Sequence, residues 1–318
     1  MDNYKNMNCL YCYKKLSASE VDFHTGCSMK MFGVTKPPLL PFTENQMEEL
    51  AVEVIQSQAA ITGVQPKISL HVTSDGARSA VKKFTIVGLW GGYILKPPTP
   101  HYEYLPEVED LTMHLAELAS IKTVPHSLMR LESGNLAYIT KRVDRIKKEK
   151  LPMEDMCQLT EKLTEDKYRG SYEQIAKTIA MYSDNPGIDI VNFMEQVVFS
   201  FITGNADMHL KNFSLIHLPK LGYTLCPAYD MVSTVLVNPE DKEELALTLN
   251  GKKKKINRND FEAAFTTLKL EPKQLENIFK KMKEAKSSWL DCIDNSFVPQ
   301  NFKDSLMVLI QNRTDKLS

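Results

Sequence analysis

Hydrophobic residues recur at helical or strand spacing along most of the chain, and the spacing divides it into three regions. Residues 46–145 alternate between strand-like and helix-like segments, whereas residues 146–318 are mainly helical. Residues 1–45 hold neither period and end in closely spaced prolines. The pattern therefore predicts an α+β fold, which the length allows to be one large domain or two lobes. In the second case residues 46–145 form a mixed β/α N-lobe and residues 146–318 a mainly helical C-lobe, preceded by a small N-terminal segment.

Residues 46–145 carry the signals of a sheet with a packed helix. Apolar side chains recur at helical spacing in residues 46–58 and 107–119, which predicts two helices. Short runs rich in β-branched and aromatic residues predict strands at residues 67–72, 81–87, 91–96, 127–131 and 136–142. We therefore expect a twisted sheet in this lobe.

Residues 146–318 contain a buried helix, a polar loop and a hairpin in succession. The helix is predicted at residues 191–203, where five apolar side chains form one stripe: Met194, Val197, Val198, Phe201 and Ile202. A hairpin is predicted between residues 213 and 226, and residues 204–212 form the polar loop before it. The order is helix, polar loop, hairpin and then Asp230.

Composition restricts the classes of function. The 39 Lys and Arg residues nearly balance the 40 Asp and Glu residues, so we expect no direct binding to nucleic acid. No apolar run is long enough to cross a bilayer, and the first residues lack the apolar core of a signal peptide. Six cysteines are too few for a disulfide scaffold. We expect a cytoplasmic protein without membrane association.

The polar loop has the spacing of a phosphoryl-transfer site. Asp207 and Asn212 lie five residues apart, as do the catalytic base and a metal-binding asparagine in protein kinases. Phosphoryl transfer needs a carboxylate to accept the proton of the attacking hydroxyl and oxygen ligands to hold Mg²⁺. We therefore predict Asp207 as the base, Asn212 and Asp230 as Mg²⁺ ligands, and Lys211 as a contact of the γ-phosphate.

The same residues have a simpler interpretation as turn residues, since Asp and Asn favour loops. The loop also departs from eukaryotic kinases, because Gly-Asn-Ala precedes Asp207 and Met-Val follows Asp230. The combination of Asp207 and Asn212 with His209, Lys211 and Asp230 is much rarer than the spacing alone, which favours the catalytic interpretation. His209 is either a catalytic residue or a structural hydrogen-bonding histidine.

A kinase also needs a lysine that binds the α- and β-phosphates and a helix glutamate that holds this lysine. Lys96 ends a predicted strand and Glu109 opens the next predicted helix. The loop before the first strand contains one glycine and is not a G-x-G-x-x-G motif. Its predicted nucleotide contacts are Thr62, Gly63, Val64, Gln65 and Lys67. The adenine is expected near Thr140, Lys141 and Arg142.

These segments together resemble the HipA family of bacterial toxin kinases. The matching segments occur in the family's order at residues 62–67, 94–96, 106–109, 142–145, 154–158, 204–214 and 227–233. The resemblance implies a two-lobed protein-kinase-like fold, ATP and Mg²⁺ as cofactors, and serine/threonine kinase activity. It also implies a HipB-like DNA-binding antitoxin as partner and a protein substrate such as an aminoacyl-tRNA synthetase, whose phosphorylation blocks translation.

Two features separate the chain from full-length HipA proteins. We expect this chain to lack the additional N-terminal subdomain of those proteins, so it looks like HipT, the short kinase of three-component systems in which a small protein, HipS, replaces that subdomain. Ala60 stands at the position that we match to the autophosphorylated serine of the family. Thr62 is the nearest hydroxyl, ahead of Ser57 and Ser69, and phosphate there is expected to disfavour ATP binding.

The N-terminal segment contains a separate candidate metal site. Cys9, Cys12, His24 and Cys27 follow the pattern C-x₂-C-x₁₁-H-x₂-C, and four such ligands in two close pairs suit tetrahedral zinc. The alternative is three free thiols and a packed histidine. The remaining cysteines are scattered, and we interpret them as core or incidental residues.

Three other functions remain open from the sequence. The first is a kinase-fold phosphotransferase that acts on a small molecule. The second is a non-catalytic module that binds nucleotide and a partner, although such a module need not retain Lys96, Asp207, Asn212 and Asp230 together. The third is a metal-dependent hydrolase that uses Asp207, His209 and Asp230, although no second pair of metal ligands lies nearby in the sequence.

Overall fold

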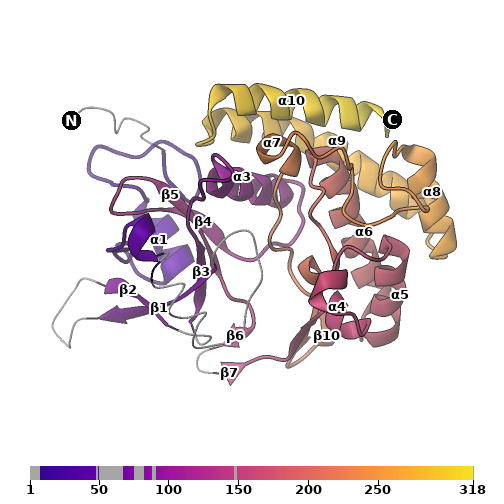
Figure 1. The fold of residues 1–318 in the computed structure, drawn as a ribbon, viewed down its shortest axis with the longest axis horizontal. Helices are drawn as coiled ribbons and strands as arrows, with labels where there is room; N and C mark the ends of the chain where they lie inside the picture. The colour runs from indigo at the N-terminus through magenta and orange to yellow at the C-terminus, as the bar shows by residue number, and fades with distance from the viewer. Residues whose placement is uncertain are drawn as a thin grey trace. The chain divides into compact units, whose positions relative to one another are not determined.

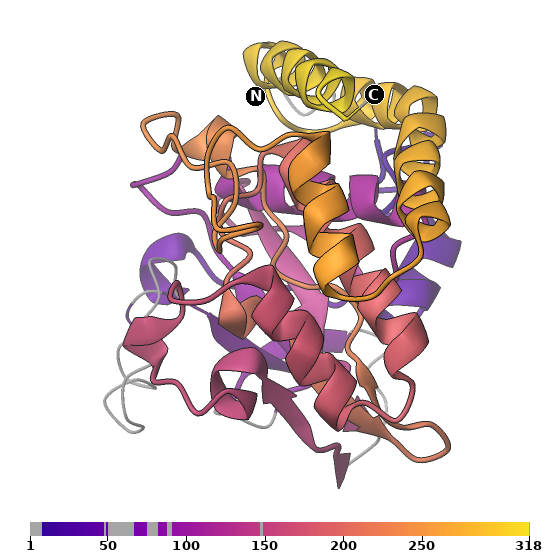
Figure 2. The same cartoon turned by 90° about the vertical axis from the view of Figure 1, so that its right-hand side faces the viewer.

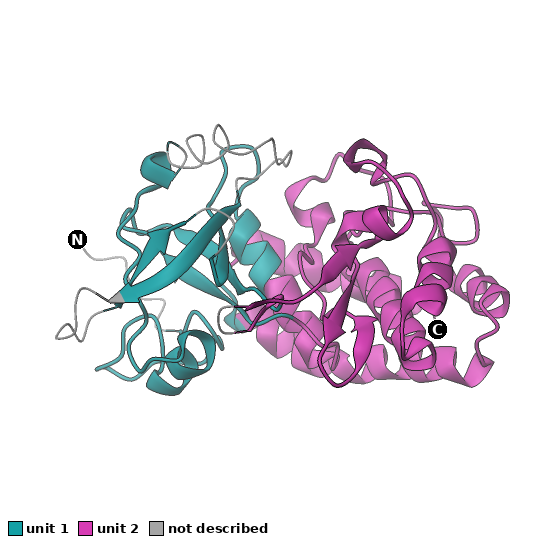
Figure 3. Cartoon of the chain, turned by 90° about the horizontal axis from the view of Figure 1, so that it is seen from below, with its two compact units in different colours: residues 1–110, 124–143, 295–297 teal, residues 111–123, 144–294, 298–318 magenta. Residues whose placement is uncertain are grey.

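The computed structural model describes residues 8–47, 49, 67–74, 82–87, 91–146 and 149–317. Its contacts divide the chain into two compact units, which Figure 3 colours separately. Unit 1 comprises Met1–Asp110, Val124–Val143 and Asn295–Phe297, and unit 2 comprises Leu111–Thr123, Asp144–Asp294 and Val298–Ser318. The division passes through helix α3, Leu105–Leu118.

The core of unit 1 is an antiparallel sheet of five strands in the order β2-β1-β3-β5-β4 (Figure 1). The strands are β1 Ile68–Ser74, β2 Lys82–Ile86, β3 Tyr93–Lys96, β4 His126–Arg130 and β5 Leu136–Lys141. In the register of β3 with β5, Leu95 lies opposite Ile139, and both side chains are fully buried. All five predicted strands are confirmed, with ends shifted by at most two residues.

The N-terminal segment contributes a helix to unit 1 that the sequence pattern did not indicate. Helix α1, Thr25–Phe32, follows His24 in extended conformation and ends at Gly33 in left-handed conformation, with φ of 71°. Phe32 packs edge-on against Phe84 of β2. Eight residues are too few for a clear period, and the helix is held by aromatic contacts with residues far along the chain.

Unit 2 is mainly helical. Its helices are α4 Met156–Leu159, η1 Thr164–Asp166, α5 Tyr172–Tyr182, α6 Pro186–Thr203, η2 Leu210–Asn212, α7 Thr234–Val237, α8 Arg258–Thr267, α9 Pro272–Asn295 and α10 Gln300–Asp315. Helix α6 is buried along most of its length and contacts α5 and α10 (Figure 2). It begins five residues before the predicted helix, since Pro186 is tolerated in the first turn.

The predicted hairpin is formed by β9, Ser214–Leu218, and β10, Gly222–Leu225. A third strand, β8 Met153–Asp155, pairs with β9 and was not predicted, because three residues carry no alternation that could identify a strand. A separate two-stranded ribbon is formed by β6 Arg145–Ile146 and β7 Glu149–Lys150. The α+β class is confirmed, with a mixed sheet-and-helix unit and a mainly helical unit.

Two other predictions can be compared with the structure only over the described residues. Of the helix predicted at residues 46–58, residues 46, 47 and 49 are helical, and the rest lies outside the described residues. Within the described part of the chain, no helix combines the length and apolar character needed to cross a membrane.

Candidate functional site

The polar loop of unit 2 begins where α6 ends. Gly204 takes a left-handed conformation, with φ of 70°, and stops the helix. Asn205 is fully buried, and its backbone N–H donates to the carbonyl of Ser200 at 2.8 Å. The side-chain oxygen of Asn205 accepts the backbone N–H of Asp207 at 3.1 Å. These bonds place Asp207 on a loop fixed by the end of a buried helix.

The five-residue spacing of Asp207 and Asn212 closes the loop on itself. The Nδ2 group of Asn212 donates to the backbone carbonyl of Asp207 at 2.8 Å, and the backbone N–H of Asn212 donates to the carbonyl of His209 at 3.0 Å. Because the amide nitrogen is engaged, the remaining polar atom of this side chain is its Oδ1 oxygen. That is the hard ligand type that Mg²⁺ prefers.

Tyr168 contacts the predicted base, and no sequence pattern had indicated this residue. Its hydroxyl donates to Oδ1 of Asp207 at 2.5 Å, and its ring lies edge-on to His209 with centroids 4.9 Å apart. Tyr168 follows η1, 39 residues before Asp207. No spacing or motif in the sequence connects the two positions.

His209 is held as a neutral imidazole. Its side chain is buried, and this burial lowers its pKa to about 4, although the nearby Asp207 carboxylate opposes the shift. Among the described residues, no group forms a hydrogen bond with its Nδ1 atom or with the buried Nδ2 atom of Asn205. Buried polar atoms without partners are costly and often mark functional sites. His209 thus has a structural contact with Tyr168, and its catalytic role stays a prediction.

Lys211 is paired within unit 2. Its ammonium group lies 3.0 Å from a carboxylate oxygen of Asp155. Asp155 also accepts the backbone N–H of Gln158 and thereby caps α4. The predicted contact of Lys211 with a γ-phosphate stays a prediction, and Asp155 is a partner that the sequence did not indicate.

Asp230 has a backbone conformation that is uncommon for a residue with a side chain. Its φ is +55°, in the left-handed region, which Asp tolerates better than most residues. Such strain is often found at functional sites. The preceding residue, Tyr229, donates from its hydroxyl to the backbone carbonyl of Lys211 at 3.0 Å, and the same hydroxyl lies 2.5 Å from the Ser214 hydroxyl. Tyr229 therefore connects the Asp230 segment to the polar loop.

Unit 1 contains the predicted lysine–glutamate pair. Lys96, at the end of β3, and Glu109, in α3, form an ion pair at 2.5 Å between side chains that are 6% and 3% exposed. The Lys96 ammonium also lies 5.4 Å from the centroid of the Tyr138 ring. A charged pair this deeply buried is costly to form, so its presence in the core calls for a role beyond stability.

The other predicted nucleotide contacts are only partly described. Thr140 is buried and its hydroxyl donates to the carbonyl of Pro125 at 3.2 Å. Lys67 and Lys141 are exposed, and the backbone N–H of Arg142 donates to the carbonyl of Gly92 at 2.9 Å. The four other predicted contacts lie outside the described residues: Thr62, Gly63, Val64 and Gln65. The adenine and phosphate-loop contacts stay predictions.

The four predicted zinc ligands also lie together in unit 1. The ligand atoms of Cys9, Cys12, His24 and Cys27 are all within 4.8 Å of one another.

The family of the chain follows from a match over most of its length. The family model described as the HipA-like C-terminal domain matches residues 59–289. The chain belongs to the HipA-like C-terminal domain family. The matched range includes the lysine–glutamate pair, the polar loop and Asp230.

Curated proteins that are similar in sequence to this HipA-like chain carry the name of kinases. The "Putative kinase Y4dM" of Sinorhizobium fredii is 31% identical over 214 residues, which cover 63% of this chain and 51% of that protein. A "Putative kinase" of Haemophilus influenzae is 29% identical over 209 residues, which cover 62% of this chain and 58% of that protein. The chain thus spans between half and three fifths of the length of these relatives.

Solved structures show the same fold at low sequence identity. The HipA chain of the Shewanella oneidensis complex of HipA, HipB and operator DNA matches with a TM-score of 0.66 and 21% identity, over 83% of this chain and 70% of that one. The Helicobacter pylori proinflammatory kinase CtkA matches with a TM-score of 0.52 and 17% identity, over 70% of this chain and 86% of that one. The two-lobed kinase-like fold is therefore established for this chain.

Proposed function

We propose that this HipA-like chain is an ATP- and Mg²⁺-dependent serine/threonine protein kinase. The observation that carries the proposal is the hydrogen bonding of the polar loop. The Asn205 side chain accepts the Asp207 N–H, and the Asn212 side chain donates to the Asp207 carbonyl. The buried pair of Lys96 and Glu109 supports it, because this pair is the second part that kinase chemistry requires. The names of the relatives as kinases agree with both features.

The proposed roles of the residues are consistent with their donor and acceptor atoms. Asp207 accepts the proton of a serine or threonine hydroxyl as that oxygen bonds to the γ-phosphorus, and the bridging oxygen leaves with ADP. Asn212 and Asp230 would hold Mg²⁺, which would supply neutralising charge for the phosphates. Lys96, oriented by Glu109, binds the α- and β-phosphates. Because its pKa is lowered to about 4, His209 is uncharged at neutral pH and adds no positive charge next to Asp207.

We further propose that the kinase is the toxin of a toxin–antitoxin system. The Shewanella HipA neighbour is named as a toxin–antitoxin protein in complex with HipB and operator DNA, and a HipB-like antitoxin is the corresponding partner here. A HipS-like small protein is a further proposed partner, on the basis of the resemblance to HipT. The substrate proposed is a protein, with an aminoacyl-tRNA synthetase as first candidate, and Thr62 is the candidate autophosphorylation site in place of Ala60.

The test is transfer of labelled γ-phosphate from ATP in an extract of the source cells. We expect a labelled protein with the unaltered chain and Mg²⁺, and none after removal of Mg²⁺. Asp230→Asn should raise the Mg²⁺ concentration needed for half-maximal transfer by about tenfold or more, since one charged oxygen ligand is lost. Label found only in a small molecule would instead support the phosphotransferase alternative, and nucleotide binding without transfer would support the non-catalytic one.

Tyr168 gives a more selective prediction for the same reaction. Tyr168→Phe removes the hydroxyl that donates to Asp207 and keeps the ring against His209. A single hydrogen bond to a charged group is worth about 1.5–3 kcal/mol, so kcat should fall by about 10- to 100-fold, with KM for ATP unchanged. Steady-state kinetics and the thermal unfolding midpoint measure this, and an unchanged kcat would mean that the bond does not position the base.

A further inference from the structure

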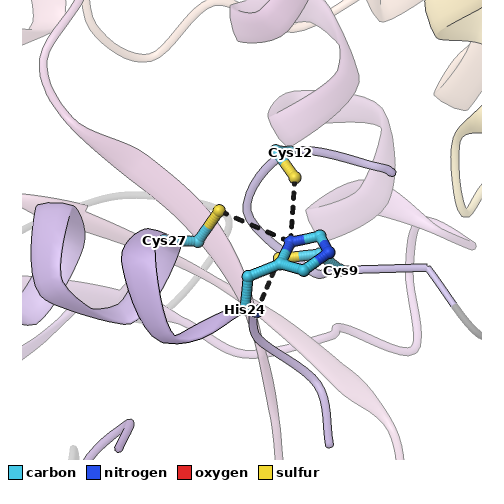
Figure 4. A group of neighbouring side chains, drawn as sticks. All are labelled: Cys9, Cys12, His24 and Cys27. Carbon is cyan, nitrogen blue, oxygen red and sulfur yellow. Dashed lines mark hydrogen bonds between the residues drawn. The ribbon is translucent and has the colours of Figure 1, made fainter. Parts of the chain in front are cut away.

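Cys9, Cys12, His24 and Cys27 form one compact cluster in unit 1 (Figure 4). The Nδ1 atom of His24 lies 3.4 Å from the Cys12 sulfur and 3.7 Å from the Cys27 sulfur. Zinc bonds of about 2.3 Å to sulfur and 2.0–2.1 Å to nitrogen at tetrahedral angles place these atoms about 3.5 Å apart. The spacing of the cluster is therefore that of one shared tetrahedral ion.

The imidazole of His24 is oriented for metal binding by its second nitrogen. Its Nε2 atom lies 3.0 Å from the backbone carbonyl oxygen of Lys15. A carbonyl can only accept, so Nε2 carries the hydrogen and Nδ1 presents its lone pair toward the sulfurs. Metal-binding histidines almost always donate their other nitrogen in this way. The tautomer required of a zinc ligand is thus set by the backbone.

A backbone N–H and a helix start also lie beside the sulfurs. The N–H of His24 donates to the Cys9 sulfur at 3.5 Å. Cys27 lies in the first turn of α1, one turn after the extended backbone of His24. All three cysteines are free thiols, so no disulfide competes for the sulfurs.

We propose that Cys9, Cys12, His24 and Cys27 bind a structural Zn²⁺ ion. Three sulfurs and one imidazole fill the four positions of a tetrahedral site, which leaves no position for a substrate or water. The ion therefore has no direct part in phosphoryl transfer. Its role is to join the turn at residues 9–14 to the start of α1.

The turn that the ion would hold is tied to the sheet and to α3. The carbonyl of Leu10 accepts the backbone N–H of Leu128 and the hydroxyl of Ser127, both in β4. Tyr13, next to Cys12, donates from its hydroxyl to Asp110 at 2.8 Å. Asp110 directly follows Glu109, the partner of Lys96. Loss of the ion should therefore loosen a segment that packs next to the predicted nucleotide-binding pair.

The first test is the metal content and coordination of the full chain, purified under reducing conditions without chelator. We expect about one zinc ion per chain, with X-ray absorption showing three sulfurs at about 2.3 Å and one nitrogen at about 2.0–2.1 Å. This measurement uses the unaltered protein, so it does not depend on whether any variant folds. Absence of zinc, together with failure of the reduced chain to bind added zinc sulfate, would overturn the proposal.

The second test compares matched cysteine substitutions. Cys12→Ser and Cys27→Ser should each lose the zinc and lower the thermal unfolding midpoint, whereas Cys292→Ser, in α9, should keep one zinc per chain. Chelator should lower the midpoint of the unaltered chain and leave that of Cys12→Ser unchanged. Equal zinc content in Cys12→Ser and the unaltered chain would assign the metal to another site. Because zinc content is read directly, failure of the kinase proposal does not affect this result.

Discussion

Asp207→Asn should reduce the rate of phosphoryl transfer by about 10²- to 10⁴-fold, which is the usual contribution of a general base. The substitution is nearly isosteric and leaves the loop intact, because Asp207 is held through its backbone N–H and carbonyl by Asn205 and Asn212. The new side chain can still accept the Tyr168 hydroxyl at the same position. The expected loss is therefore in kcat, with ATP affinity and stability nearly unchanged.

The measurement is single-turnover transfer from labelled ATP to the acceptor, with nucleotide affinity measured separately. Asp304→Asn is the matched control, since this α10 side chain contacts Gln300 and lies in an exposed position. Growth arrest on expression should disappear with Asp207→Asn and persist with Asp304→Asn. A transfer rate within about twofold of the unaltered chain would show that Asp207 is not the base.

Lys96→Met should lower kcat/KM for ATP by about 10- to 100-fold, because a charge-assisted contact with phosphate is worth about 1.5–3 kcal/mol. The same substitution removes the ammonium group that pairs with the buried Glu109 carboxylate. Breaking a buried pair in this way costs about 3–5 kcal/mol, so the free energy of unfolding should also decrease. One substitution thus affects both nucleotide use and stability.

A double substitution separates the two effects. Lys96→Met with Glu109→Leu removes both charges, and replacement of a buried pair by apolar residues is often neutral for stability. We expect urea unfolding to return close to that of the unaltered chain while the defect with ATP remains. Lys82→Met, at an exposed position of β2 in the same sheet, is the control and should change neither property. Recovery of ATP use in the double variant would show that Lys96 is a structural residue.

Local patterns were sufficient for most of the secondary structure. The five strands of unit 1 were found because their alternation and bounding turns are short-range signals. The spacing of Asp207 and Asn212 was informative for the same reason. The hydrogen bond that closes this loop joins two residues at a fixed, short separation in the sequence. Helix α1 and strand β8 were missed because both are short and owe their stability to distant partners.

The sequence by itself predicted the α+β class, the polar loop and the pairing of Lys96 with Glu109, because each of these rests on patterns along the chain. Only the tertiary structure decided which side chains meet the loop. Tyr168 reaches Asp207 across 39 residues, and Asp155 reaches Lys211 across 56. A tyrosine hydroxyl or a carboxylate looks the same in sequence whether it faces solvent or a catalytic residue. Packing of distant segments, which no local period encodes, selects its partner.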